Sequence, residues 1–233
     1  MTARIVHFVG PTDEFEREAR RRGYRRIAGL DEAGRGPLAG PVVASAVVLP
    51  SRCRLSGCDD SKLLTESERE ELYLVITQRA VGIGIGSASE QEIDQLNILE
   101  ATRLAMQRAL AGLRPQPDCL LIDAISLPAC SIPLRSIIKG DALCMSVAAA
   151  SIVAKVTRDR LMAEYHRQYP HYNFLSHKGY CTEEHLQQLA THGPCLIHRR
   201  TYAPVAEAIA HSAHPRPAAS ALWKSSGQER DNS

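Results

Sequence analysis

Four carboxylates stand at or just beyond the ends of predicted strands, where side chains are well placed to do chemistry. These acids are Asp31, Glu32, Asp123 and Asp141. The predicted strands that precede them are residues 27–30, 119–122 and 134–138, of which the first two are apolar throughout. Ligands of open α/β sheets bind outside the carboxyl ends of the strands, so the acids are expected to meet there. Neighbouring carboxylates that lose their hydration on burial repel one another strongly, and a bound divalent cation offsets that repulsion.

Oxygen ligands of this kind suit hard cations, so the expected cofactor is Mg²⁺ or Mn²⁺. Two such ions about 4 Å apart are the usual device for displacement at phosphorus. The sequence shows no Ser-His-Asp order, no context for a Cys nucleophile and no Walker loop. The acids therefore favour hydrolysis of a phosphodiester. For Asp141 an alternative stays open, because a long helix is predicted from residue 142 and Asp141 stands where its N-cap would be.

A glycine-rich turn follows the first pair of acids. Residues 27–50 predict a strand, a turn and a returning strand, with Gly34, Gly36 and Gly40 around Arg35. Glycines let backbone N–H groups come close to a ligand, and Arg35 adds a positively charged fork. Such a loop can hold a phosphate or a sugar hydroxyl. An ordinary hairpin with solvated acids is the alternative.

Cations and aromatic side chains that could hold a polynucleotide are spread along the chain. Those singled out are Arg35, Lys62, Lys178, Tyr180 and Arg199. Ser61 and Lys62 precede a helix predicted at residues 66–79 from a Thr65–Glu68 capping box, and helix starts often hold phosphate. Segment 169–182 interleaves aromatic residues with cations, as stacking on sugars or bases requires. A plain turn and a packed loop are the respective alternatives.

Two further helices are predicted to flank the sheet. Strictly alternating glycines at residues 81–86 indicate a strand that another element approaches closely. A helix predicted at 98–113 packs small residues on the sheet. In the long helix that follows Asp141, Lys155 and Arg158 lie about 20 Å along the axis. They are therefore interpreted as surface or packing residues.

Length and composition set the frame for these elements. The chain has 233 residues, 44% of them hydrophobic, and a net charge of +2, which fits one large domain but says little about partners. We expect a helical extension at residues 1–24, a catalytic domain at 25–210 and a disordered tail at 211–233. No apolar run is long enough to cross a membrane, and the N-terminus lacks signal-peptide order, so a cytoplasmic monomer is expected. Seven scattered cysteines without a CxxC pair support neither disulfides nor zinc.

Several segments together resemble a known family. They are GLDEAGRGPLAGPVVASAVVL, DDSK, LLID, KGD with AAASIVAKVTRD, YPHYNFLSHKGYCT and HGPCLIHRRTYAPV. In content and order they resemble bacterial type 2 ribonuclease H, ribonuclease HII, over roughly residues 23–205. Ala124 and Cys181 stand where that family commonly or frequently has glycine.

The resemblance implies a ribonuclease H-like α/β fold, with a mixed five-stranded sheet flanked by helices and a small C-terminal helical part. It also implies four metal ligands: Asp31 on both ions, Asp141 on the ion that activates water, and Glu32 with Asp123 on the leaving-group side. The implied substrate is an RNA–DNA hybrid or a single ribonucleotide in duplex DNA. Cleavage on the 5′ side of the ribonucleotide would leave 3′-hydroxyl and 5′-phosphate ends.

The resemblance assigns substrate contacts as well. Gly34, Arg35 and Gly36 would read the ribose 2′-hydroxyl, and Tyr180 would pack on the adjoining sugar. The DSK element with Ser61 and Lys62 would approach a backbone phosphate. Two hypotheses from other classes compete: a hybrid-binding module without catalysis, which would not need four acids, and a DNA nuclease, which would not need a reader of the 2′-hydroxyl.

Overall fold

The computed structural model contains one mixed five-stranded sheet in the order β3-β2-β1-β4-β5. It describes residues 10–55, 57–58, 64–128 and 130–213. Strands β1 (Ile27–Ala33), β2 (Val42–Val48) and β3 (Gly82–Ala88) pair antiparallel. Strands β4 (Cys119–Asp123) and β5 (Leu134–Ile137) extend the sheet in parallel from β1. The expected mixed five-stranded sheet is confirmed.

The register of the central strands places the first acids side by side. Leu30 of β1 pairs with Ile122 of β4, so Asp31 and Asp123 follow at the same level of the sheet. Strands β1, β2 and β4 are largely buried, with β2 enclosed along its whole length. The first strand is longer than the sequence suggested, because β1 continues to Ala33 and includes both Asp31 and Glu32.

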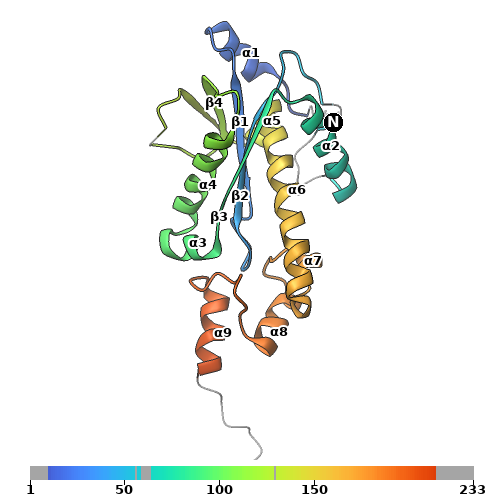
Figure 1. Ribbon diagram of the computed structural model, residues 1–233, viewed down its shortest axis with the longest axis vertical. Helices are drawn as coiled ribbons and strands as arrows, with labels where there is room; N and C mark the ends of the chain where they lie inside the picture. The colour runs from blue at the N-terminus through green and yellow to red at the C-terminus, as the bar shows by residue number, and fades with distance from the viewer. Residues whose placement is uncertain (1–9, 56, 59–63, 129, 214–233) are drawn as a thin grey trace, which may run out of the picture.

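Helices cover both faces of the sheet (Figure 1). Helix α4 (Ile98–Gly112) lies against β2 and β3, and α3 (Glu90–Leu96) leads into it. A Cβ added at Gly84 or Gly86 would collide with the backbone of α4, which accounts for the alternating glycines. On the opposite face α6 (Met145–Gln168) runs along β1 and β2, with α2 (Glu66–Arg79) beside it. The Thr65–Glu68 capping box at the start of α2 is present as predicted.

The prediction of one long helix from residue 142 is wrong at the beginning of that helix. A one-turn helix, α5 (Gly140–Leu143), comes first, and Cys144 is extended before α6 begins. Cys144 forms a bridge with Thr12, and the backbone N–H of Met145 donates to the Thr12 carbonyl at 2.9 Å. The segment before α1 (Glu14–Arg21) therefore interrupts the helix by pairing with its backbone.

A small helical part lies beyond the ends of β1 and α6 (Figure 1). It comprises η1 (Pro170–Tyr172), α7 (Phe174–His177), α8 (Glu183–His192) and α9 (Ala203–Ala213). Helix α9 includes residues 211–213 of the expected tail, and residues 214–233 lie outside the described part of the chain. Among the described helices, none has the length and apolar character needed to span a membrane.

Candidate active site

A cavity of about 430 Å³ opens at the carboxyl ends of β1 and β4. Three of the four predicted acids line it, together with the glycine-rich turn. Its lining residues are Asp31, Glu32, Ala33, Gly34, Arg35, Gly36, Arg69, Asp123, Ser151, Lys155 and Tyr180. Residues from β1, β4, α2, α6 and the segment after α7 thus meet in one place.

Burial destabilises the charged forms of two acids in this cavity, Asp31 and Glu32. Asp31 is 5% exposed, and burial raises the pKa of its carboxyl well above the usual range, with further rises from the charges of Glu32 and Asp123. A hydrogen bond with the Ser151 side chain only partly offsets this rise. Burial also raises the pKa of Glu32, although Arg35, whose Nη1 lies 3.2 Å from Glu32 Oε1, opposes that shift.

The donor set fits a divalent cation. Glu32 Oε2 is buried and has no hydrogen-bond partner among the residues that the structure describes, and it belongs to a cavity that concentrates three carboxylates. A cation of high charge would stabilise all three anions and satisfy that oxygen. Within the described residues, no group of three or more His, Cys, Asp or Glu side chains is already arranged as a metal site. Asp123 Oδ1 instead accepts a hydrogen bond from the Gly140 N–H at 2.8 Å.

Asp141 follows Gly140, whose N–H binds Asp123, but Asp141 is not among the residues that line the cavity. It is 4% exposed and accepts a hydrogen bond from the Ala142 N–H at 3.0 Å. The hydrogen bond from Gly140 to Asp123 ties the start of α5 to the end of β4. The capping alternative is wrong, because Lys139 and Cys144 occupy the N-cap positions of α5 and α6.

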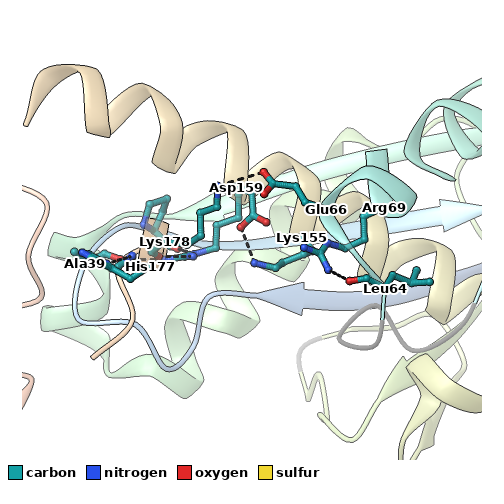
Figure 2. A network of polar contacts seen from close by, with 11 residues as sticks. Ala39, Leu64, Glu66, Arg69, Lys155, Asp159, His177 and Lys178 are labelled. Carbon is teal, nitrogen blue, oxygen red and sulfur yellow. Dashed lines mark hydrogen bonds and ion pairs between the residues drawn. The ribbon is translucent and has the colours of Figure 1, made fainter. Parts of the chain in front are cut away.

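The predicted substrate-binding residues divide into three groups. Gly34, Arg35, Gly36 and Tyr180 line the cavity with the acids, and the Tyr180 side chain is 44% exposed. Lys178 does not line it; its Nζ lies 3.4 Å from Oε1 of Glu66 on α2, as Figure 2 shows. Ser61 and Lys62 lie outside the described residues.

Sequence reasoning missed Arg69, Ser151 and Lys155. Lys155 is salt-bridged to Asp159, with Nζ 2.6 Å from Oδ1 (Figure 2), and burial lowers the pKa of its ammonium. The distance of about 20 Å along the helix from Asp141 does not exclude Lys155 from the site. Helix α6 runs along β1 and brings Lys155 to the cavity at the end of that strand. The spacing of Ser151 and Lys155, one helical turn apart after a run of small residues, was the available signal.

Burial decides between the alternatives for the aromatic segment and shows that the prediction for Arg199 is wrong. Tyr172, Phe174 and His177 of the aromatic segment are buried, so the packed-loop alternative describes them. Arg199 is fully buried, and its guanidinium donates to backbone carbonyls of the glycine-rich turn. It therefore cannot touch a polynucleotide directly. Tyr180 is the exposed aromatic residue of the segment that faces the cavity.

Comparison with known proteins agrees with this architecture. A Ribonuclease HII from Desulfitobacterium hafniense is 57% identical over 187 residues, which cover 80% of this chain and 72% of the relative. The ribonuclease H2 structure from Pyrococcus horikoshii superposes with a TM-score of 0.70 at 28% identity, covering 82% of this chain and all of that one. Bst-RNase HIII in complex with Mn²⁺ shares the fold at 17% identity, with a TM-score of 0.61 over 82% of this chain and 71% of its own.

The family model described as Ribonuclease HII matches residues 28–205. This range contains four whole strands, β1 from its second residue onward, the three acids of the cavity, Asp141 and the glycine-rich turn. On this match and the identity to the curated relatives, the chain belongs to the ribonuclease HII family.

Proposed function

We propose that this ribonuclease H enzyme incises duplex DNA on the 5′ side of a single embedded ribonucleotide and leaves 3′-hydroxyl and 5′-phosphate ends. Its family supports ribonuclease H activity on RNA–DNA hybrids with a divalent metal cofactor. The observation that carries the finer proposal is the shared cavity, in which three acids face Arg35 and Tyr180. Acids alone would suit any phosphodiester, whereas the adjacent turn offers groups that can distinguish ribose.

The acids of the cavity would hold two divalent ions, Mg²⁺ or Mn²⁺. In this proposal Asp31 contacts both, Glu32 and Asp123 serve the leaving-group side, and Asp141 serves the side of the attacking water. Bound ions would lower the pKa of that water and stabilise charge on the phosphate. To take this role, the Asp141 carboxylate would leave the Ala142 N–H that it now accepts from and turn into the cavity.

The substrate would be held by the groups around the acids. Backbone N–H groups and the side chain of the Gly34–Arg35–Gly36 turn read the 2′-hydroxyl, while Tyr180 packs on the adjoining sugar. Lys178, Ser61 and Lys62 would contact backbone phosphates. Lys155 and Arg69 add positive charge inside the cavity, where a phosphate next to the cleavage site would lie. We further propose that the enzyme acts as a monomer in the cytoplasm.

Matched duplexes test this function. The wild-type protein is incubated in Mg²⁺ with three substrates of one sequence: all-DNA, DNA with one ribonucleotide, and an RNA–DNA hybrid. The proposal predicts a single nick 5′ of the lone ribonucleotide, with ends identified by ligation and by phosphatase sensitivity. Cleavage of all-DNA at the same rate would indicate a DNA nuclease, and binding without cleavage would indicate a hybrid-binding module; either result would refute the proposal.

A further inference from the structure

Two buried arginines lie directly behind the glycine-rich turn. Arg158 of α6 is 1% exposed and Arg199, after α8, is 0% exposed. Within the described part of the chain neither is ion-paired with a carboxylate, although the charge of the buried Glu90 acts on both. Burial lowers the pKa of both guanidinium groups, that of Arg158 to about 10. An arginine side chain stays charged at neutral pH even when it is buried. Burying two such charges side by side is costly unless their N–H donors are satisfied by hydrogen bonds.

The N–H groups of the Arg199 guanidinium donate hydrogen bonds to backbone carbonyls of the turn. Its Nη2 donates to Gly34 at 2.5 Å and to Gly40 at 2.7 Å, its Nη1 donates to Arg35 at 3.0 Å, and its Nε donates to Gly40 at 2.9 Å. The Tyr202 hydroxyl donates to the same Arg35 carbonyl at 2.8 Å and accepts from Arg199 Nη1 at 3.1 Å. One planar guanidinium thus fixes both ends of the turn.

Arg158 connects the turn to the segment that carries Tyr180. Its Nε donates to the Pro41 carbonyl at 3.1 Å, and its Nη2 donates to Ala39 at 3.0 Å. Its Nη1 donates to the Lys178 carbonyl at 3.0 Å, two residues before Tyr180. The Leu38 N–H also donates to the Gly179 carbonyl at 2.8 Å, so the turn and the tyrosine segment are held against each other.

The direction of these hydrogen bonds matters for recognition. In a planar trans peptide, the C=O and N–H groups point in opposite directions. When the Gly34 and Arg35 carbonyls turn inward to Arg199, the N–H groups of Arg35 and Gly36 turn away from it. Both residues line the cavity. The buried arginine therefore orients the backbone donors that a ribose hydroxyl would meet.

We infer that Arg158 and Arg199 are positioning residues for ribose selectivity, which fix the Gly34–Gly36 turn and Tyr180 at a set separation without touching the substrate. Lysine cannot replace either arginine in this role, because an ammonium lacks the planar fork that reaches several carbonyls at once. The inference rests on the proposed function, since it assumes that the turn and Tyr180 read the ribonucleotide.

The test compares affinities for two duplexes that differ by one 2′-hydroxyl, measured by fluorescence anisotropy without divalent ions. The variants are Arg158→Lys, Arg199→Lys and Tyr202→Phe. Arg160→Lys is the matched control, because Arg160 also lies on α6 but pairs with Glu70 at the surface, Nη2 to Oε2 2.6 Å. The quantity compared is the ratio of the two dissociation constants. Partial unfolding lowers binding of both duplexes equally and cancels from this ratio.

The two arginine variants are expected to reduce the preference for the ribonucleotide duplex by at least about fivefold, the equivalent of about one hydrogen bond. Tyr202→Phe should reduce it less, since it removes one hydroxyl and leaves the arginine in place; this variant carries the test if Arg199→Lys does not fold. Arg160→Lys should keep the wild-type ratio. Unchanged ratios in folded Arg158→Lys and Tyr202→Phe would overturn the inference, whereas a wild-type protein without any preference would overturn the proposed function as well.

Discussion

Replacing Gly29 by alanine should push α6 away from β1 and displace the residues of α6 that line the active site. An added Cβ at Gly29 would lie under 3.0 Å from three backbone atoms of Ser146 and Val147. Carbon atoms in ordinary contact are about 3.5–4.0 Å apart, so α6 must move by on the order of 1 Å. Backbone atoms cannot rotate aside as a flexible side chain can. Overpacking of this kind costs about 1–3 kcal/mol, and Tm should fall by about 2–12 °C at 2–4 °C per kcal/mol.

The displaced helix carries Ser151 and Lys155, which line the cavity beside Asp31. A misplacement of about 1 Å at reacting groups can cost about 100-fold in rate. Cleavage of the single-ribonucleotide duplex, assayed well below Tm, should therefore fall by one to two orders of magnitude. Gly112→Ala is the control, because a Cβ there meets nothing within 4 Å. Wild-type Tm and rate in Gly29→Ala would show that α6 does not set the geometry of the cavity.

Three other predictions concern separate parts of the molecule. Burial lowers the pKa of His185 and His198 to about 4. As the pH falls below about 6.5 the unfolded chain takes up protons before the folded protein does, so the free energy of unfolding should fall by up to about 2 kcal/mol per histidine at pH 5. An NMR titration should show both imidazoles neutral at pH 5, and a midpoint near 6.5 would contradict their burial. Ala124 has a φ of 45°, so Ala124→Gly should leave urea-unfolding stability unchanged or raise it by up to about 1 kcal/mol, and a clear loss would argue against strain there. Cys181 is exposed, whereas burial raises the pKa of the Cys144 thiol, so Cys181 should react faster with a thiol reagent. The Cys181→Ser variant should therefore lose the fast phase of that reaction in the native protein, and a persistent fast phase would contradict this.

Local signals in the sequence predicted most elements of the fold. The Thr65–Glu68 capping box located α2, and alternating glycines predicted that another element would lie tightly on β3. The meeting of Asp31 with Asp123 was also predictable, because parallel neighbours end at one edge of the sheet. Such features depend on residues close in the chain or on general rules of topology.

The remaining features depend on long-range packing. Lys155 reaches the cavity because α6 runs along β1, and distance along a helix does not reveal that direction. Arg199 was misinterpreted because the sequence shows its charge but not its burial behind the turn. The break before α6 arises from pairing of Cys144 with Thr12, residues far apart in sequence. Asp141 consequently lies on a separate turn of helix, next to the cavity but not among its lining residues.

Binding of Mn²⁺ to the wild-type protein and to two variants tests the shared metal site most directly. Electron paramagnetic resonance counts bound Mn²⁺ for wild type, Asp31→Asn and Asp141→Asn, with Glu70→Gln as a control at a surface ion pair. Asp31→Asn should lose tight Mn²⁺ binding while Tm stays equal or rises, since its carboxylate is destabilised by burial. Asp141→Asn should lose one of two ions. Wild-type Mn²⁺ binding by Asp31→Asn would contradict the claim that this carboxylate is the centre of the site.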